Sequence, residues 1–133
     1  YLGALGAADV SLFAAVGRDA LGAYFRDAVG AEGCVGLDGL VELPDHPTSV
    51  CVVLSGASDR GFVSCNRSNA ALTARALDQE RLRGMHLVHF GGFFNMVGLH
   101  GEETVALARE LRRAGARLTL DTQFDISGAW DGR

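Results

Sequence analysis

The sequence predicts an α/β fold, in which a parallel sheet carries helices and a smaller β layer is inserted between them. Compact apolar runs of four to seven residues are typical of buried parallel strands. These runs lie at residues 10–16, 85–90 and 117–120. Residues 20–30 and 101–114 repeat their apolar positions with the 3.6-residue period of a helix. Residues 36–65 are instead rich in β-branched side chains and turn residues, which indicates short strands.

The first strand and helix have clear boundaries in the sequence. The run at 10–16 ends at Gly17, and Asp19 is a good N-cap for the helix that follows. Gly30 and Gly33 are expected to end this helix. Its predicted apolar face consists of Leu21, Tyr24, Phe25, Ala28 and Val29.

Three strand-like segments make up the middle of the chain. They cover residues 36–43, 48–55 and 60–65, and are separated by turn sequences at 44–47 and 56–59. Val50, Val52 and Leu54 alternate with Cys51 and Val53, so both faces of this ribbon are apolar. We therefore predict that 36–65 forms a small antiparallel sheet that covers another part of the protein.

The second half returns to alternating helices and strands. A helix is expected over 69–82, where Thr73 would cap residues 74–82, and a core strand over 85–90 is followed by Gly91 and Gly92. The most regular helix spans 101–114 and ends before Gly115. Its predicted core face consists of Val105, Leu107, Ala108 and Leu111. We interpret the whole chain, residues 1–133, as one domain with right-handed crossovers.

Composition narrows the classes of function. The 133 residues carry a net charge of −4 without a basic patch, which argues against binding to nucleic acid. No apolar run approaches the roughly 18 residues of a membrane span. The cysteines are odd in number, which favours a reducing, cytoplasmic compartment. His86 and His89 would point to opposite faces of a strand, so we expect no directly held metal.

The end of the chain carries the most polar strand edge. The strand at 117–120 delivers Asp121 at its carboxyl end, where ligands bind in open α/β sheets. Asp125 and Asp131 follow in a short loop that also holds Trp130. The alternative for Asp121 is a residue that caps a turn. Gly91 and Gly92 either let the backbone approach a ligand or form a simple turn, and Asn95 is within reach of a hydroxyl.

Five short motifs follow one another along the chain. They are LGA at 5–7 with VSLFAAVGRDALG at 10–22, PTSV at 47–50, CNRSNAAL at 65–72, LVHFGGFF at 87–94, and LDTQFD at 120–125 with WD at 130–131. In this order they resemble the ribokinase-like, or phosphofructokinase-B-type, carbohydrate kinases. The resemblance implies a Rossmann-like, ribokinase-type three-layer sandwich, present in part, with an inserted β-sheet lid at about residues 36–65.

The resemblance also implies an activity, its cofactors and its partners. The activity is ATP-dependent phosphorylation of a sugar or nucleoside, with ATP and Mg²⁺ as cofactors and a homodimer formed through the lid. Substrate-binding residues would be Thr48, Asn69, Gly91, Gly92 and Asn95. Asp121, Gln123 and Asp125 would lie near the phosphates or the metal. Most of the ATP site would lie outside this chain.

The sequence departs from the family pattern at several points. Ala7-Ala8 lengthens the first motif, and Gln123 and Ile126 stand where many members have asparagine and proline. The family's Gly-Gly-Asn turn would precede Tyr1, and its Gly-Ala-Gly-Asp segment with the catalytic aspartate would follow Arg133. We therefore expect a segment of a longer chain that is inactive by itself. The alternatives are a non-catalytic ribokinase-like binding or assembly module, and an unrelated flavodoxin-like domain with a continuous parallel sheet.

Overall fold

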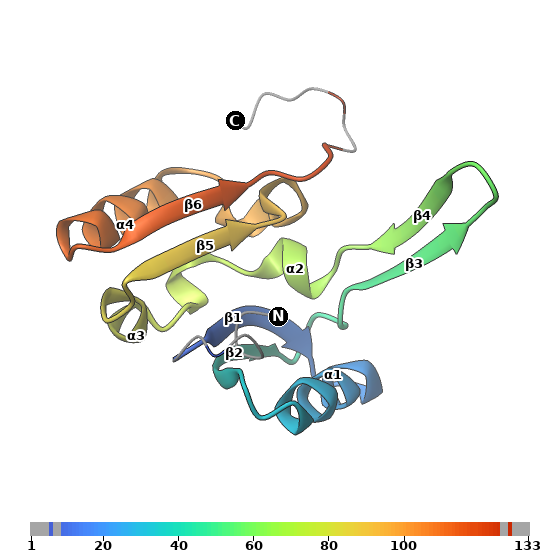
Figure 1. Ribbon diagram of the computed structural model, residues 1–133, viewed down its shortest axis with the longest axis horizontal. Coiled ribbons are helices and arrows are strands. Elements are labelled where there is room, and N and C mark those ends of the chain that lie inside the picture. Colours follow the sequence, from blue (N-terminus) through green and yellow to red (C-terminus); the bar gives the residue numbers. More distant parts are fainter. Residues whose placement is uncertain (1–5, 7–8, 126–127, 129–133) are drawn as a thin grey trace.

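The computed structural model describes residues 6, 9–125 and 128 (Figure 1). Within them the strands form three two-stranded sheets, two parallel and one antiparallel. The two parallel pairs lie on either side of the short helix α2 (Ser68–Ala71), and the antiparallel hairpin projects to one side. The prediction of an α/β fold with a small inserted β layer is confirmed.

The first parallel pair is a β–α–β unit. Strand β1 (Ser11–Gly17) leads into helix α1 (Ala20–Ala31), and β2 (Gly36–Leu43) returns beside β1 with Gly17 opposite Leu43. The helical crossover brings the chain back in the same direction, which makes the pairing parallel. The prediction that residues 36–43 belong to the antiparallel sheet is therefore wrong.

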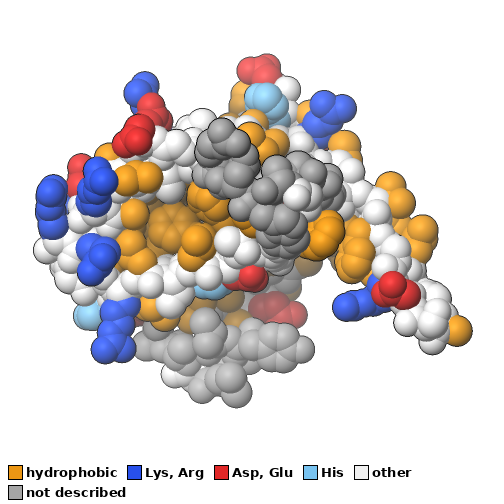
Figure 2. Space-filling view, turned by 90° about the horizontal axis from the view of Figure 1, so that it is seen from above, with side chains coloured by type: hydrophobic (Ala, Val, Ile, Leu, Met, Phe, Trp, Pro, Cys, Tyr) orange, Lys and Arg blue, Asp and Glu red, His pale blue; other side chains and the backbone are white. Residues whose placement is uncertain are grey.

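Strands β3 (Val50–Ser55) and β4 (Arg60–Cys65) form the antiparallel hairpin, with Val50 opposite Cys65 and Ser55 opposite Arg60. Every residue of both strands is exposed. Figure 2 shows the hairpin as an arm that stands away from the body, with hydrophobic side chains along it. The turn at 56–59 therefore lies at the free tip of this arm.

The single helix predicted over 69–82 is wrong. The chain forms α2, a 3₁₀ turn η1 (Ala74–Ala76) and helix α3 (Gln79–Arg83), with extended backbone at Leu72 and Leu77. Leu72, Leu77 and Leu82 are all buried. Residues five positions apart in one straight helix lie about 140° apart around its axis and cannot share a face. The breaks allow all three leucines to enter the core.

The second parallel pair carries the other half of the core. Strand β5 (Leu87–Gly91) is followed by the 3₁₀ turns η2 (Phe93–Asn95) and η3 (Val97–Leu99), helix α4 (Glu102–Arg113) and strand β6 (Arg117–Asp121). The parallel register runs from Leu87 opposite Arg117 to Gly91 opposite Asp121. Both strands end on the side from which the hairpin projects (Figure 1).

Helix faces differ in part from those predicted. In α4 the buried stripe is Thr104, Leu107 and Leu111, whereas Val105 is 40% exposed because it lies about 100° from Thr104. In α1 the buried position is Gly22, and Leu21 and Tyr24 are 51% and 71% exposed. Leu120, predicted to lie in a buried strand, is 59% exposed.

One hydrophobic cluster joins the two parallel pairs. Partly buried side chains of β1, β2, β5 and β6 pack against it. Its buried members are Ala15, Leu72, Ala74, Leu77, Leu82, Leu99, Leu107, Leu111 and Ala116. The cluster therefore joins β5 and β6 to β1 and β2.

Candidate functional site

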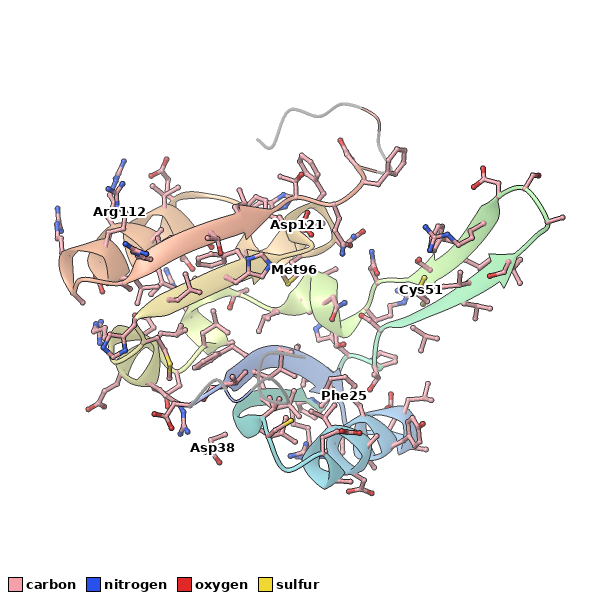
Figure 3. All side chains as sticks on the ribbon, viewed as in Figure 1. Phe25, Asp38, Cys51, Met96, Arg112 and Asp121 are labelled. Carbon is pink, nitrogen blue, oxygen red and sulfur yellow. The ribbon has the colours of Figure 1, made fainter. Side chains whose placement is uncertain are left out.

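Asp121 is the last residue of β6. In Figure 3 it lies at the end of this strand, on the side of the molecule from which the hairpin with Cys51 projects. Its carboxylate is exposed, and its Oδ1 accepts a hydrogen bond of 2.9 Å from the backbone N–H of Gln123. Gln123 has a φ of 56°, in the left-handed region that residues other than glycine seldom adopt. Such backbone strain is often stored at functional sites.

Carboxamides from separate segments gather beside this turn. The Nδ2 of Asn95, in η2, donates to the Oε1 of Gln123 at 3.4 Å, and its Oδ1 accepts from the Nδ2 of Asn66 at 3.2 Å. Asn66 directly follows β4. Gly92, with a φ of 70°, passes so close that a Cβ there would lie 3.4 Å from the Gln123 Oε1. The loops after β5 and β6 and the exit of the hairpin therefore meet at one edge.

The loop after β5 is fixed from behind by His100. Its Nε2 donates to the carbonyl oxygen of Phe93 at 2.9 Å, and the two rings stack with centroids 4.6 Å apart. The backbone N–H of Phe94 donates to the carbonyl oxygen of Thr122 at 3.2 Å, which joins this loop to the one after β6. Asn95 is thereby held next to the end of β6.

Two serines anchor the base of the hairpin. Ser68 is fully buried, and its hydroxyl donates to the carbonyl oxygen of Ala15 in β1 at 3.0 Å and accepts from the N–H of Ser49. The Ser49 hydroxyl accepts from the N–H groups of Arg67 and Asn69, both at 2.9 Å. The entrance and the exit of the hairpin are thus bound to each other and to the sheet.

Asp19 and Thr48 form a second anchor. The Asp19 carboxylate caps α1 through Gly22 and accepts from both the hydroxyl and the N–H of Thr48, while the Thr48 hydroxyl accepts from the N–H of Gly17. The hydrogen bond from the Thr48 hydroxyl, followed by that from its N–H, lowers the pKa of Asp19. Close packing at Gly22 requires glycine, because a Cβ there would overlap the carbonyl oxygen of Gly17.

The predicted site residues therefore fall into two groups. Gly91, Gly92, Asn95, Asp121 and Gln123 lie together at the carboxyl edge of β5 and β6. Thr48 and Asn69 lie at the base of the hairpin, where the Thr48 hydroxyl and the Asn69 N–H make the anchoring bonds. Asp125 is buried, 8% exposed, in contrast to Asp121. Asp131 and Trp130 lie outside the described residues.

Two of the open hollows in the described part of the chain are lined by residues other than Asp121. One, of about 400 Å³, is lined by Gly17, Asp19, Arg26 and Glu42 among others. The second, of about 660 Å³, lies along the amino-terminal half of β6. Of the residues 36–65 predicted to form the lid, 36–43 belong to the parallel β1–β2 pair, and the β3–β4 hairpin projects from the body as an arm.

Sequence reasoning did not identify Asn66, Ser49 or Ser68. All three flank the hairpin, at the points where a β ribbon leaves the body of the protein. Small hydroxyl and amide side chains at both ends of a ribbon are a signal that their side chains bond to nearby backbone. Among residues 9–125 no group of three or more possible metal ligands occurs. In the described part no helix is long and apolar enough to span a bilayer.

A family model described as pfkB family carbohydrate kinase matches residues 1–130. This chain belongs to the pfkB family of carbohydrate kinases. No curated protein matched the chain. The pfkB assignment confirms the resemblance drawn from the five motifs and explains why they occur in that order.

Solved structures share the fold at low sequence identity. An uncharacterised sugar kinase from Pyrococcus horikoshii is 16% identical with a TM-score of 0.75, over 95% of this chain and 41% of its own. A fructokinase from Xylella fastidiosa with bound ATP is 18% identical with a TM-score of 0.67, over 86% of this chain and 37% of its own. An Escherichia coli structure described as a candidate ribokinase II, in complex with ATP and Mg²⁺, is 22% identical with a TM-score of 0.71. The match covers 87% of this chain and 37% of that chain.

These solved structures confirm the ribokinase-type fold. The chain spans about two fifths of the length of each neighbour compared above. The flavodoxin-like alternative required a sheet without an inserted β layer, and the β3–β4 hairpin contradicts it.

Proposed function

We propose that the protein containing this chain phosphorylates a hydroxyl group of a sugar or related small molecule with ATP, and that this chain supplies the lid and part of the substrate pocket. The observation that supports the proposal most is the convergence of the β5 and β6 ends with the exit of the hairpin through Asn66, Asn95 and Gln123. Membership of the pfkB family supports the same reaction class.

In this proposal Asp121 acts near the metal. Mg²⁺ prefers oxygen ligands and is usually held by one or two carboxylates, phosphate oxygens and water. The exposed Asp121 carboxylate fits that role, directly or through a bound water. ATP with Mg²⁺ would supply the phosphoryl group and neutralise its charge. Asp125 and Gln123 are proposed to lie near the same phosphates.

The remaining predicted residues are assigned to the substrate side. Gly91 and Gly92 would let a ligand approach the backbone, and the Asn95 amide would contact a hydroxyl. Thr48 and Asn69 would act through the base of the hairpin, which they help to anchor. The apolar hairpin would close over the sugar and exclude water, which phosphoryl transfer requires to avoid hydrolysis of ATP.

A phosphotransfer assay tests the proposal. The product of the complete gene, incubated with Mg²⁺, ATP and a panel of neutral sugars, is expected to form ADP only when a sugar is present. The 133-residue chain assayed alone is expected to be inactive. Absence of sugar-dependent ADP from the complete protein would contradict the kinase, and robust turnover by the 133 residues would contradict the expected division of roles.

An assembly role is favoured by a separate observation. One face of the hairpin carries only apolar or small side chains: Val50, Val52, Leu54, Gly61, Val63 and Cys65. We propose that this face of the hairpin pairs with a second copy of the chain.

The variant V52K, which places a charge at a position 50% exposed, is expected to shift a dimer to monomer in sedimentation velocity. A wild-type protein that is monomeric at all concentrations would exclude this pairing. If the dimer forms but no sugar is phosphorylated, the non-catalytic module becomes the better assignment.

A further inference from the structure

Three carboxamides form a row that crosses from the hairpin to the sheet edge. Asn66 lies at the exit of the hairpin, Asn95 in the loop after β5 and Gln123 in the turn after β6. The row is joined by hydrogen bonds of 3.2 Å and 3.4 Å. Asn66 is the only member that belongs to the hairpin side, so it is the point where the hairpin and the sheet edge touch through side chains.

The row has bonding capacity left for a ligand. A carboxamide has two donor hydrogens and an acceptor oxygen with two lone pairs. Within the described residues, the structure records no hydrogen bond to the Asn66 Oδ1 or from the Gln123 Nε2. Asn66 and Gln123 are exposed and Asn95 is half-buried, so these groups are open to a ligand.

The chemistry of the row selects neutral hydroxyl groups. A hydroxyl both donates and accepts, and a carboxamide can complement both bonds. The three amide side chains are uncharged, and the Asn66–Asn95 end of the row, which lies away from the Asp121 turn, therefore suits a neutral hydroxyl better than a phosphate or carboxylate. The Nδ2 of Asn66 and the Oδ1 of Asn95 are 3.2 Å apart, so the two amides lie close enough to contact hydroxyls on adjacent carbon atoms of one molecule.

The row is built with a rigid backbone. The backbone of Gln123 has a positive φ, and its N–H donates to the Asp121 carboxylate. The N–H of Asn95 donates to the carbonyl oxygen of Gly92 at 2.9 Å. Next to Asn66, the N–H of Arg67 is held by Ser49. Preorganised amides lose little freedom when a ligand binds, which favours their use in recognition.

We propose that Asn66 is a specificity-determining residue that binds a hydroxyl of the substrate together with Asn95 and Gln123. This inference rests on the proposed function for the class of substrate, a neutral polyhydroxylated molecule. It adds to that function a contact made by the hairpin exit rather than by the strand ends.

The experiment compares N66A with the matched control S64A in the product of the complete gene. Ser64 lies two residues away on β4, and its hydroxyl donates to the Cys51 Sγ and not to the amide row. Each protein is titrated with D-fructose and with its monodeoxy analogues by calorimetry, and kcat and KM are measured with ATP. Losing one hydrogen bond is expected to raise Kd and KM for the full sugar about tenfold, with kcat changed less than about twofold.

The decisive readout is discrimination between sugars. Wild type and S64A are expected to prefer the full sugar over one deoxy analogue by about tenfold, and N66A to lose that preference at one position only. Equal weakening for all analogues, or the same change in S64A, would overturn the inference and leave the kinase intact. Binding that N66A weakens selectively, without phosphorylation by wild type, would support the inference and reject the kinase. If wild type binds neither D-fructose nor any other sugar of the phosphotransfer panel, both the inference and the kinase are rejected.

Discussion

Replacing Asp121 with asparagine in the product of the complete gene is expected to lower kcat for sugar phosphorylation about a hundredfold and to leave folding unchanged. Loss of one electrostatic group at the reacting centre typically has an effect of this size. The asparagine oxygen can still accept the N–H of Gln123, as the Asp121 carboxylate does at 2.9 Å, so the turn is kept. The substitution therefore removes the charge alone, and steady-state kinetics with varied Mg²⁺ measures its effect.

Asp78 provides the matched control for Asp121. Asp78 is the N-cap of α3, and its carboxylate accepts a hydrogen bond of 3.0 Å from the backbone N–H of Arg81, as the Asp121 carboxylate accepts one from Gln123. Helix α3 lies away from the side on which the hairpin projects (Figure 1). Asparagine is an equally good N-cap, so D78N is expected to keep kcat within about twofold of wild type. If D121N is as active as D78N, the Asp121 carboxylate only caps its turn, as the alternative reading of the sequence holds.

The variant L111A is expected to reduce the free energy of unfolding by about 2–5 kcal/mol, because it leaves a cavity in the core. Leu111 in α4 has no exposed surface and belongs to the cluster that joins both parallel pairs. A loss of this size is a large fraction of the stability of an ordinary domain. Urea unfolding followed by circular dichroism measures it.

Val105 on the same helix is the control for Leu111. It is 40% exposed and lies beside the buried stripe, so V105A is expected to cost less than about 1 kcal/mol. Similar losses for the two variants would mean that α4 packs with the face first predicted from its apolar pattern. That outcome would contradict the arrangement of α4 described above.

The candidate site was predictable where it depends on strand ends. Apolar runs that stop at Gly91 and Asp121 mark the carboxyl ends of two strands, and parallel pairing brings these residues opposite each other. The contact between Asn66 and Asn95 spans 29 positions in the sequence, and no local pattern encodes it. It depends on the path of the whole hairpin and on the anchor made by Ser49 and Ser68.

The α/β class, the hairpin turn, the N-cap Asp19 and the family could be predicted from the amino-acid sequence, because each follows from local periodicity, turn chemistry or short motifs. Tertiary packing was needed to pair β2 in parallel with β1, to break residues 68–83 into three short helical pieces, and to project the hairpin as an arm from its anchored base. These features depend on which surfaces are buried against each other. Burial is a property of the packed chain, and segments distant in sequence supply both sides of each contact.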